Sequence, residues 1–437
     1  MILEFSEEIQ LLDTVDVLVI GGGAAGFSAA TMAARNGAKT ILAERNGSLG
    51  GTTTYAEITP MMPNNYAADG IREHAVSLDQ PLFLEWLEQM YSYLPEDLHK
   101  DCATYFSRQA KTVSKDINAL AMEDLCINAG VRILYHFEMV KVLAEERKIT
   151  TVIFLTPGGY VALKAKVFID ASGDGDFSVA AGCRYDMGDE NGVCQPMTTC
   201  FKLSHIDPSK FTHELVQEKF LEAKTRGMIS TCREDLLRFG YYDADVIHFN
   251  STRVIGKSPL NPVERSEAEI EGRKQVREII AWLRAYIPGF EHCRLHSLAA
   301  QIGVRESRRI KGIRTITKED FLLRSKFPDG IARCNYPMDI HSSTGAGTQN
   351  IFMGISDFFE IPYGCLVPAD IDNLLLAGRI ISTSREINAS IRVMPVACSI
   401  GQAAGTAAAL SIETETLPFA LNGCSVRNKL KEVGAFL

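Results

Sequence analysis

Hydrophobic residues occur along this chain in short runs, several of which lead directly into glycine. The first clear run is VDVLVI at residues 15–20, and GGGAAG follows it. A run with so little alternation is typical of a parallel strand buried on both faces, so we predict a strand here. The alanine-rich stretch after it predicts a slim helix ended by Gly37, and residues 40–43 predict a second strand closing on Glu44. The start of the chain therefore predicts a βαβ unit.

The glycines between the first predicted strand and helix have the G-x-G-x-x-G spacing of dinucleotide-binding proteins. We expect Gly21 to form the tight turn, Gly23 to let a pyrophosphate approach the backbone, and Gly26 to let the helix pack on the strand. Ala24 and Ala25 then lie in the first turn, where the positive end of the helix attracts phosphate. The alternative is an ordinary glycine-rich turn. The agreement of strand, spacing and helix favours the dinucleotide site.

The acid at the end of the second predicted strand bears on the choice of nucleotide. Glu44 lies 21 residues after Gly23. A carboxylate at this place accepts both ribose hydroxyls of an adenosine and repels a 2′-phosphate, which disfavours NADP. NAD and FAD both have an ADP half, so the two remain to be distinguished.

Two later segments favour FAD over NAD. Residues 166–176, KVFIDASGDGD, and residues 373–379, NLLLAGR, are apolar runs that end in glycine with a charged residue. Ligands of open parallel sheets lie beyond the carboxyl ends of the strands. Three such ends, far apart in sequence, suit a long ligand stretched across the sheet, and we therefore predict FAD.

The remaining pattern divides the chain into two interleaved parts. We expect residues 56–125 to be mainly helical and residues 131–170 to form a strand-rich meander with its turn at the two glycines 158 and 159. A long insertion follows, with a strand at 197–206 and a helix at 263–286 that ends before Pro288 and Gly289.

The predicted fold class is α/β. It comprises a Rossmann-like FAD-binding domain, with a parallel sheet and a β-meander, and an inserted α+β substrate or cap domain. We assign residues 1–55, 110–185 and 365–437 to the FAD-binding domain, and residues 56–109 and 186–364 to the cap.

Four later motifs carry a resemblance to a known family. They are QPMTTCFKL at 195–203, GVRESRRIKG at 303–312, IPYGCLVP at 361–368 and RVMPVACSIGQAAGTAAAL at 392–410. With the glycine motif, they make nearly the whole chain resemble the bacterial FAD-dependent oxidoreductases of the glutathione reductase and succinate dehydrogenase flavoprotein superfamily.

The resemblance implies a set of FAD-binding positions. Glu44 is expected to hold the adenosine ribose, Val140 to meet adenine through its backbone, and Asp174 to support the dinucleotide. The full set expected to bind FAD is Gly21, Gly23, Ala24, Ala25, Gly26, Glu44, Arg45, Gly50, Gly51, Thr52, Thr53, Val140, Ala171, Ser172, Gly173, Asp174, Gly378, Arg379, Met394, Gln402 and Ala403.

The last part of this set departs from the superfamily pattern in one place. An acid that contacts the ribityl chain usually follows the glycine of the third flavin motif, whereas this chain has Arg379 after Gly378. Further on, Pro395 suits the first position of a helix. If the amino end of that helix faces the flavin pyrimidine, it stabilises the negative charge of the reduced ring. The alternative is a terminal helix that only packs.

Composition and charge exclude several classes of protein. The 437 residues are 46% hydrophobic and carry a net charge of −9, which disfavours a nucleic-acid partner. The basic segment at 305–314 is too local to reverse this. The first ten residues, MILEFSEEIQ, are acidic where a secretory signal is basic, and no apolar stretch reaches the ~18 residues of a membrane span. We expect a cytoplasmic protein without a membrane partner or a metal site.

The eleven cysteines do not indicate disulfide chemistry. None forms a C-x-x-C pair, and the double glycine at 50–51 is followed by TTTYAEI where disulfide reductases carry their cysteines. No iron–sulfur spacing occurs. We interpret the cysteines as core thiols, with an active role for Cys194 and Cys200 as the weaker alternative.

Four residues are candidates for contact with substrate, and each has a structural alternative. Arg392 precedes the terminal helix, in the place where fumarate reductases keep a substrate-carboxylate arginine, or it forms an ion pair. His341 acts as a general acid or base or is structural. Arg305 shapes the pocket or joins a charged network with its neighbours. Tyr363 donates a hydrogen bond to substrate or packs as an aromatic ring.

The sequence supports two functions. The first is a flavoenzyme that transfers hydride between flavin N5 and a small polar substrate. In the more specific form of this hypothesis, the substrate carries a carboxylate. The second is an electron-transfer subunit whose flavin passes electrons to a partner protein. This alternative stays open because no second glycine motif for NAD(P)H occurs, so the electron donor or acceptor is unknown. No histidine lies close after the double glycine, so we expect the FAD to be non-covalent. The histidine and arginine motifs of true fumarate and succinate enzymes are not reproduced.

Overall fold

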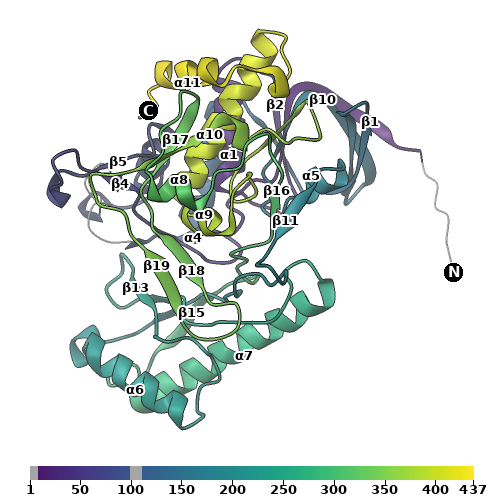
Figure 1. Cartoon of the computed structure of the whole chain (residues 1–437). Helices are drawn as coiled ribbons and strands as arrows, with labels where there is room; N and C mark the ends of the chain where they lie inside the picture. The colour runs from purple at the N-terminus through teal and green to yellow at the C-terminus, as the bar shows by residue number, and fades with distance from the viewer. Residues whose placement is uncertain (1–7, 99–110) are drawn as a thin grey trace.

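The computed structural model describes residues 8–98 and 111–437, so most of the acidic start of the chain lies outside the described part. A central sheet has the strand order β7-β2-β1-β10-β9-β8, with β21 also paired to β10 (Figure 1). Its strands are β1 (Gln10–Ile20), β2 (Thr40–Glu44), β7 (Arg132–Tyr135), β8 (Glu138–Glu145), β9 (Lys148–Thr156), β10 (Gly159–Asp170) and β21 (Leu374–Leu376). The predicted parallel sheet with an antiparallel meander, β8-β9-β10, is confirmed.

The parallel register of three strands brings their carboxyl ends together. Ile20 of β1 pairs with Asp170 of β10, and Asp170 pairs with Leu376 of β21. Gly21, Ala171 and Ala377 therefore begin three adjacent loops at one edge of the sheet. The sequence-based expectation that these strand ends share one edge is confirmed.

Two helices pack against each other unusually closely beside this edge. They are α1 (Ala24–Arg35) and α10 (Met394–Glu413), and a Cβ on Gly401 or Gly405 would overlap the carbonyl oxygens of Ala25 and Ala29. α10 begins one residue before Pro395, close to the predicted start. It is long and apolar enough to cross a membrane, so the prediction that no apolar stretch reaches this length is wrong. However, 89% of its apolar window is buried inside the protein, as in a core helix.

The inserted segment forms a second layer with a core of its own. Strands β13 (Arg238–Gly240), β14 (Ile247–Phe249), β12 (Phe201–Ser204) and β15 (Arg294–Leu298) form an antiparallel sheet in that order. Helices α6 (His213–Thr225) and α7 (Pro262–Tyr286) cover it at the lower end of Figure 1. Phe201 stacks on Phe249 in this core.

The structure differs from the predicted division of the chain in two places. Residues 56–125 contain only two described α-helices, α2 (Leu82–Tyr91) and α4 (Lys115–Asn128), with the short strands β3 (Pro60–Met61), β4 (Asn65–Tyr66), β5 (Val76–Ser77) and β6 (Lys111–Thr112). Prolines and asparagines at 60–65 interrupt helical structure there. The side chains of Met61 and Trp86 also join the main core rather than the cap.

Residues 310–364, which we assigned to the cap, also pack largely with the main core. This region contains α8 (Lys318–Leu322), β17 (Gly330–Cys334), β18 (Met338–His341), β19 (Thr348–Ile351) and β20 (Phe359–Pro362). The remaining elements are α5 (Asp176–Ala180), β11 (Tyr185–Met187), β16 (Arg308–Ile310), α9 (Arg385–Ile391) and α11 (Gly423–Glu432). Phe321, Ile331 and Phe359 are buried in the main core, and this packing joins the segment to that core. The order of the segments along the sequence does not show this.

The close contact of α1 with α10 predicts a steric test. Gly405→Ala should destabilise the protein by about 1 to 3 kcal/mol, because the added methyl group overlaps the Ala29 carbonyl and the helices must separate. Gly240→Ala is the control, since no atom lies within 4 Å of its added Cβ. Urea denaturation measures both variants, and equal stabilities would contradict the close contact.

Candidate cofactor and substrate site

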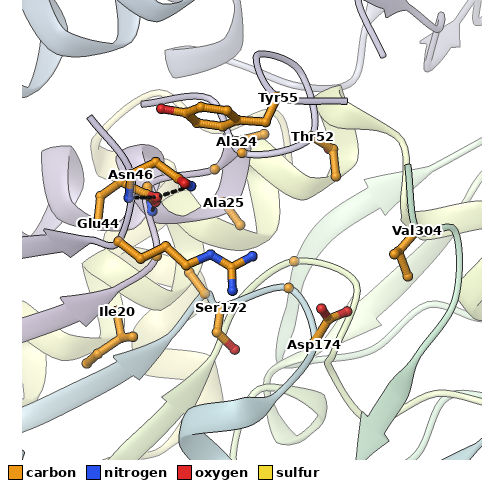
Figure 2. A pocket seen from close by; sticks show the side chains of 18 of the residues that line it. Ile20, Ala24, Ala25, Glu44, Asn46, Thr52, Tyr55, Ser172, Asp174 and Val304 are labelled. Atoms are coloured by element: carbon orange, nitrogen blue, oxygen red, sulfur yellow. Dashed lines mark hydrogen bonds between the residues drawn. The ribbon is translucent and has the colours of Figure 1, made fainter. Parts of the chain in front are cut away.

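A long cavity lies at the carboxyl edge of the sheet. It encloses about 1250 Å³ of space, part of it open to solvent, and its wall includes the loops after β1, β2, β10 and β21 together with residues of the cap. Figure 2 shows Glu44 and Asn46 on one side of this cavity and Asp174 with Val304 on the other.

The loop after β1 leaves backbone donors free toward the cavity. Helix α1 begins after Gly23, no side chain of the described residues caps it, and its first turn holds no acid. Ala24 and Ala25 line the cavity. A Cβ on Gly26 would overlap the Gly21 carbonyl oxygen, so the tight strand–helix turn requires glycine there. These free N–H groups and the helix dipole suit a phosphate.

Glu44 is already engaged by the protein. Its carboxylate is 4% exposed and accepts hydrogen bonds from Gly22 N (2.7 Å), Asn46 N (2.8 Å) and Asn46 Nδ2 (2.7 Å). A carboxylate offers about four lone-pair sites, so roughly one is left over. Glu44 can therefore accept one ribose hydroxyl without displacing these donors, whereas the sequence analysis expected it to accept both.

Asp174 is an ion-pair centre on the far wall of the cavity. Asp174 is 4% exposed and accepts a hydrogen bond from Arg379 Nη2 (2.7 Å). Its carboxylate also lies 3.5 Å from Nη1 of Arg265, a residue of the cap helix α7. Burial alone would raise the pKa of Asp174, but the two arginines lower it below its ordinary value. Arg379 thus pairs with a carboxylate in the loop after β10. This pairing explains why this chain can have a cation at the position where the superfamily has an acid.

Arg392 lies at the end of the cavity where α10 begins. Its Nη2 donates to the Asp339 carbonyl (2.9 Å) and lies 3.3 Å from Asp339 Oδ2, and its side chain is 10% exposed. Its Nη1 is buried without a hydrogen-bond partner among the described residues. Arg392 is therefore in part a structural ion pair and in part an unsatisfied donor at the cavity wall.

His341 is held neutral next to this ion pair. Arg253 Nη2 lies 2.9 Å from His341 Nδ1, and Asp339 Oδ2 lies 3.3 Å from Nε2. An arginine can only donate, so Nδ1 accepts and Nε2 carries the proton. Burial, with the nearby charge of Arg305, lowers the pKa of His341 to about 3. The expected general acid or base at neutral pH is therefore wrong, because both nitrogens are engaged and the ring stays uncharged.

The other substrate candidates lie behind the cavity wall. Arg305 is 8% exposed and donates to the Pro196 carbonyl at 2.6 Å. Tyr363 is 3% exposed, and its hydroxyl donates to the Pro418 carbonyl (2.9 Å), so the packed-aromatic alternative is correct. Cys194 and Cys200 are buried free thiols whose pKa is raised to about 12 by burial, which argues against an active thiol.

Comparison with known proteins identifies the family. The model of the FAD dependent oxidoreductase family matches residues 16–430. The chain belongs to this family. It is an FAD-binding enzyme, as the sequence resemblance implied. The wall of the cavity fits this cofactor, because it combines free helix N–H groups, a buried carboxylate with spare acceptor capacity and the ends of three strands.

The individual proteins that resemble this chain match it either over a short segment or at low sequence identity. A fumarate reductase (cytochrome) of Shewanella frigidimarina is 54% identical over 44 residues, which is 10% of this chain and 8% of that relative. A p-nitrophenol 4-monooxygenase of Pseudomonas putida is 10% identical with a TM-score of 0.48, covering 97% of this chain and 84% of that one. The flavin-dependent brominase Bmp2 is 12% identical with a TM-score of 0.49, covering 95% and 83%. These similarities are too low to transfer any property.

Most of the expected FAD-binding residues lie in the wall of the cavity. They are Gly21, Gly23, Ala24, Ala25, Glu44, Arg45, Gly51, Thr52, Ala171, Ser172, Gly173, Asp174, Gly378, Arg379 and Met394. Their assignment to individual atoms of FAD stays a prediction.

Six expected residues lie outside this wall, each for a physical reason. Gly26 packs against Gly21, Gly50 donates its N–H to the Gly22 carbonyl, and Thr53 Oγ1 donates to the Gly50 carbonyl (2.7 Å). These three shape the loops from behind. Gln402 and Ala403 lie deeper in α10, where Gln402 Nε2 donates to the Gln80 carbonyl (3.0 Å). Val140 is 45% exposed, and its neighbours Glu138 and Met139 line the cavity in its place.

The sequence analysis missed wall residues that come from other segments. Arg265, Gln301, Ile302 and Val304 reach the cavity from the cap, and Tyr55 reaches it from the loop after the double glycine. No local motif distinguishes them. Their position depends on how the cap docks over the sheet.

Glu44→Gln should weaken FAD binding at least about tenfold. A glutamine has one acceptor oxygen, so its amide NH₂ must face Gly22 N–H or the Asn46 donors, and the charge-assisted bond to ribose is lost. Glu138→Gln removes a charge from the same wall and is the control. Dilution of each holoprotein gives the FAD dissociation constant, and acid precipitation releases the whole of a non-covalent flavin for quantification. Equal constants in the two variants would remove Glu44 from the ribose site.

The lowered pKa of His341 predicts a pH dependence of stability. The unfolded chain protonates this histidine near pH 6.5 and the folded protein only near pH 3, so the unfolded state binds more protons in between and stability falls as the pH falls. His341→Asn should lose less stability than the parent between pH 6.5 and 5, by up to about 1.4 kcal/mol per pH unit. His213→Gln, on the exposed start of α6, is the control. Parallel pH slopes of the parent and His341→Asn in urea denaturation would show that His341 titrates normally.

Proposed function

We propose that this FAD-dependent oxidoreductase is a dehydrogenase or reductase that transfers hydride between flavin N5 and a small polar substrate that carries a carboxylate. The observation that supports this proposal is Arg392, whose buried Nη1 lacks a partner at the wall of the cavity, directly before the amino end of α10. An arginine in this state lacks an anionic acceptor, which a substrate carboxylate provides.

The residues around Arg392 orient it and keep the site dry. Bound FAD supplies the hydride donor or acceptor. Asp339 holds Nη2 of Arg392 and so directs the guanidinium. Although burial alone would raise it, the pKa of Asp339 lies far below its ordinary value, because His341 donates to it and Arg392 is close. Ile302 and Val304 of the cap contribute apolar surface to the wall, which helps to exclude water.

The alternative proposal is an electron-transfer subunit whose flavin exchanges electrons with a partner protein. The single glycine motif supports it, since a nicotinamide donor has no second site of this kind in the sequence. Turnover of a small carboxylate by the purified protein with an artificial acceptor favours the enzyme. A redox protein that co-purifies and reoxidises the reduced flavin favours the alternative. The cytoplasmic location and the absence of nucleic-acid and membrane partners stay proposals, supported by the net charge of −9.

Arg392→Lys tests the enzyme proposal. Lysine keeps the charge but cannot contact Asp339 and a substrate carboxylate as a planar fork does, so kcat/KM should fall about 10- to 100-fold, or about 1.4 to 2.7 kcal/mol. Arg238→Lys is the control, because Arg238 lies against the Phe211 ring within the cap and is not one of the residues that line the cavity. A screen of small carboxylates with an artificial acceptor provides the assay, and perturbation of the flavin spectrum reports binding. Unchanged turnover in Arg392→Lys with an active substrate would refute the anchoring role.

A further inference from the structure

Arg305 is a buried arginine without a counterion. It is 8% exposed and forms no ion pair with any carboxylate in residues 8–98 and 111–437. Its guanidinium donates instead to two neutral oxygens, the Pro196 carbonyl (2.6 Å) and Asn250 Oδ1 (3.4 Å). Burial, with the nearby cations Arg392 and Arg233, lowers its pKa to about 9, so it is still charged at neutral pH. An uncompensated buried charge is costly, and the charge therefore needs an explanation.

The charged groups around Arg305 do not neutralise it. Arg392 pairs with Asp339 at 3.3 Å, Arg233 pairs with Asp235 at 2.8 Å, and Arg253 pairs with Glu234 at 3.0 Å. Each of these pairs has a net charge of zero. His341 is uncharged, as its two hydrogen-bonded nitrogens and its burial require. The cluster thus carries one net positive charge, that of Arg305.

The unsatisfied polar atoms of this cluster include three donors. Nη1 of Arg392, Nη1 of Arg233 and Nε2 of Gln195 are buried without hydrogen-bond partners in the described part of the chain. The orientation of Gln195 is fixed, because its Oε1 accepts the N–H of His341 (3.1 Å) and the side chain is 2% exposed. Unpartnered donors next to an uncompensated cation favour an acceptor with one negative charge.

The cavity wall beside this cluster is apolar. Val304 precedes Arg305, Met394 and Ala397 follow Arg392, and all three line the cavity with Ile302. The other two wall arginines that form ion pairs, Arg265 and Arg379, share the single carboxylate of Asp174. That group therefore also carries one net positive charge, but it lies on the far wall among the residues expected to bind FAD. A second carboxylate on a substrate bound at Arg392 would meet the apolar groups of this part of the wall. The free-energy cost of removing this second carboxylate from water would not be offset by an ion pair there.

We infer that the substrate of this site is a monocarboxylate with an otherwise apolar or uncharged body, and that its carboxylate binds Arg392 and compensates the charge of Arg305. This inference rests on the proposed function, since it specifies the substrate class of the same site. Arg305 is a specificity-determining residue in this arrangement. It sets the number of negative charges that the site accepts.

Binding of three small probes to the holoprotein tests the inference. Propionate has one charge, succinate has two, and propionamide is a neutral analogue of propionate. We expect propionate to perturb the flavin absorbance saturably, succinate to bind at least about tenfold more weakly, and propionamide to give no response at the same concentrations. The readout is binding and does not require turnover.

Two variants of Arg305 and one control separate charge from structure. Arg305→Met should weaken propionate binding at least about tenfold, whereas Arg305→Lys should stay within a few-fold of the parent when both are measured at about pH 6, where the buried lysine is more fully charged. The Lys variant preserves the test if the Met variant does not fold. Arg238→Met is the control, because Arg238 is also unpaired among the described residues but lies against the Phe211 ring within the cap. It should bind propionate as the parent does.

The outcomes distinguish this inference from the proposed function. Tighter binding of succinate than of propionate, or unchanged propionate binding in Arg305→Met, would overturn the inference and leave Arg392 as a carboxylate anchor. If the parent holoprotein responds to neither acid, both the anchor and the inference fail. A tenfold loss in Arg305→Met, with an unchanged response in Arg238→Met, would establish the charge of Arg305 as the determinant.

Discussion

The parallel pairing of β1, β10 and β21 is the constraint on which the site depends. Because Ile20, Asp170 and Leu376 lie side by side, the three loops that follow them open at the same edge of the sheet. The cavity follows from this register. The packing of α10 on α1 reinforces it, since glycines at 401 and 405 let the two helices approach closely enough for both amino ends to reach the cavity. The two helices whose amino ends line the cavity are thus held together by one contact.

The carboxylates of Asp174 and Asp339 organise the charges around this cavity differently. Asp174 binds two arginines, one from the sheet and one from the cap, and this links the cap to the nucleotide-binding loops. Asp339 binds Arg392 but leaves Arg305 uncompensated. Each centre carries one net positive charge. At the first, both arginines contact the shared carboxylate, whereas at the second Arg305 forms no ion pair among the described residues.

Residue type alone was a poor guide to catalytic roles. His341 lies in a sequence rich in Ser, Thr and Gly that is typical of a loop, yet it belongs to β18, and its residue is only 6% exposed. Its neighbour across the cap interface, Arg253, is 88 residues away in the chain and determines its tautomer. Tyr363 is likewise buried by contact with Pro418. No pattern near these residues encodes such partners, because they depend on long-range packing.

The sequence by itself determined the FAD-binding unit, since strand, glycine spacing, helix and Glu44 are local features set by backbone geometry within one βαβ segment. It also determined the meander and the long cap helix, whose periodicity and turn residues are local. Only the tertiary structure decided which residues close the cavity and which charges remain unpaired. Arg379 is acceptable in the cavity wall because Asp174 pairs with it across 205 positions of sequence. Arg305 forms no ion pair because none of the described acids lies within contact distance of its guanidinium, and this is a property of the packed whole that no stretch of sequence displays.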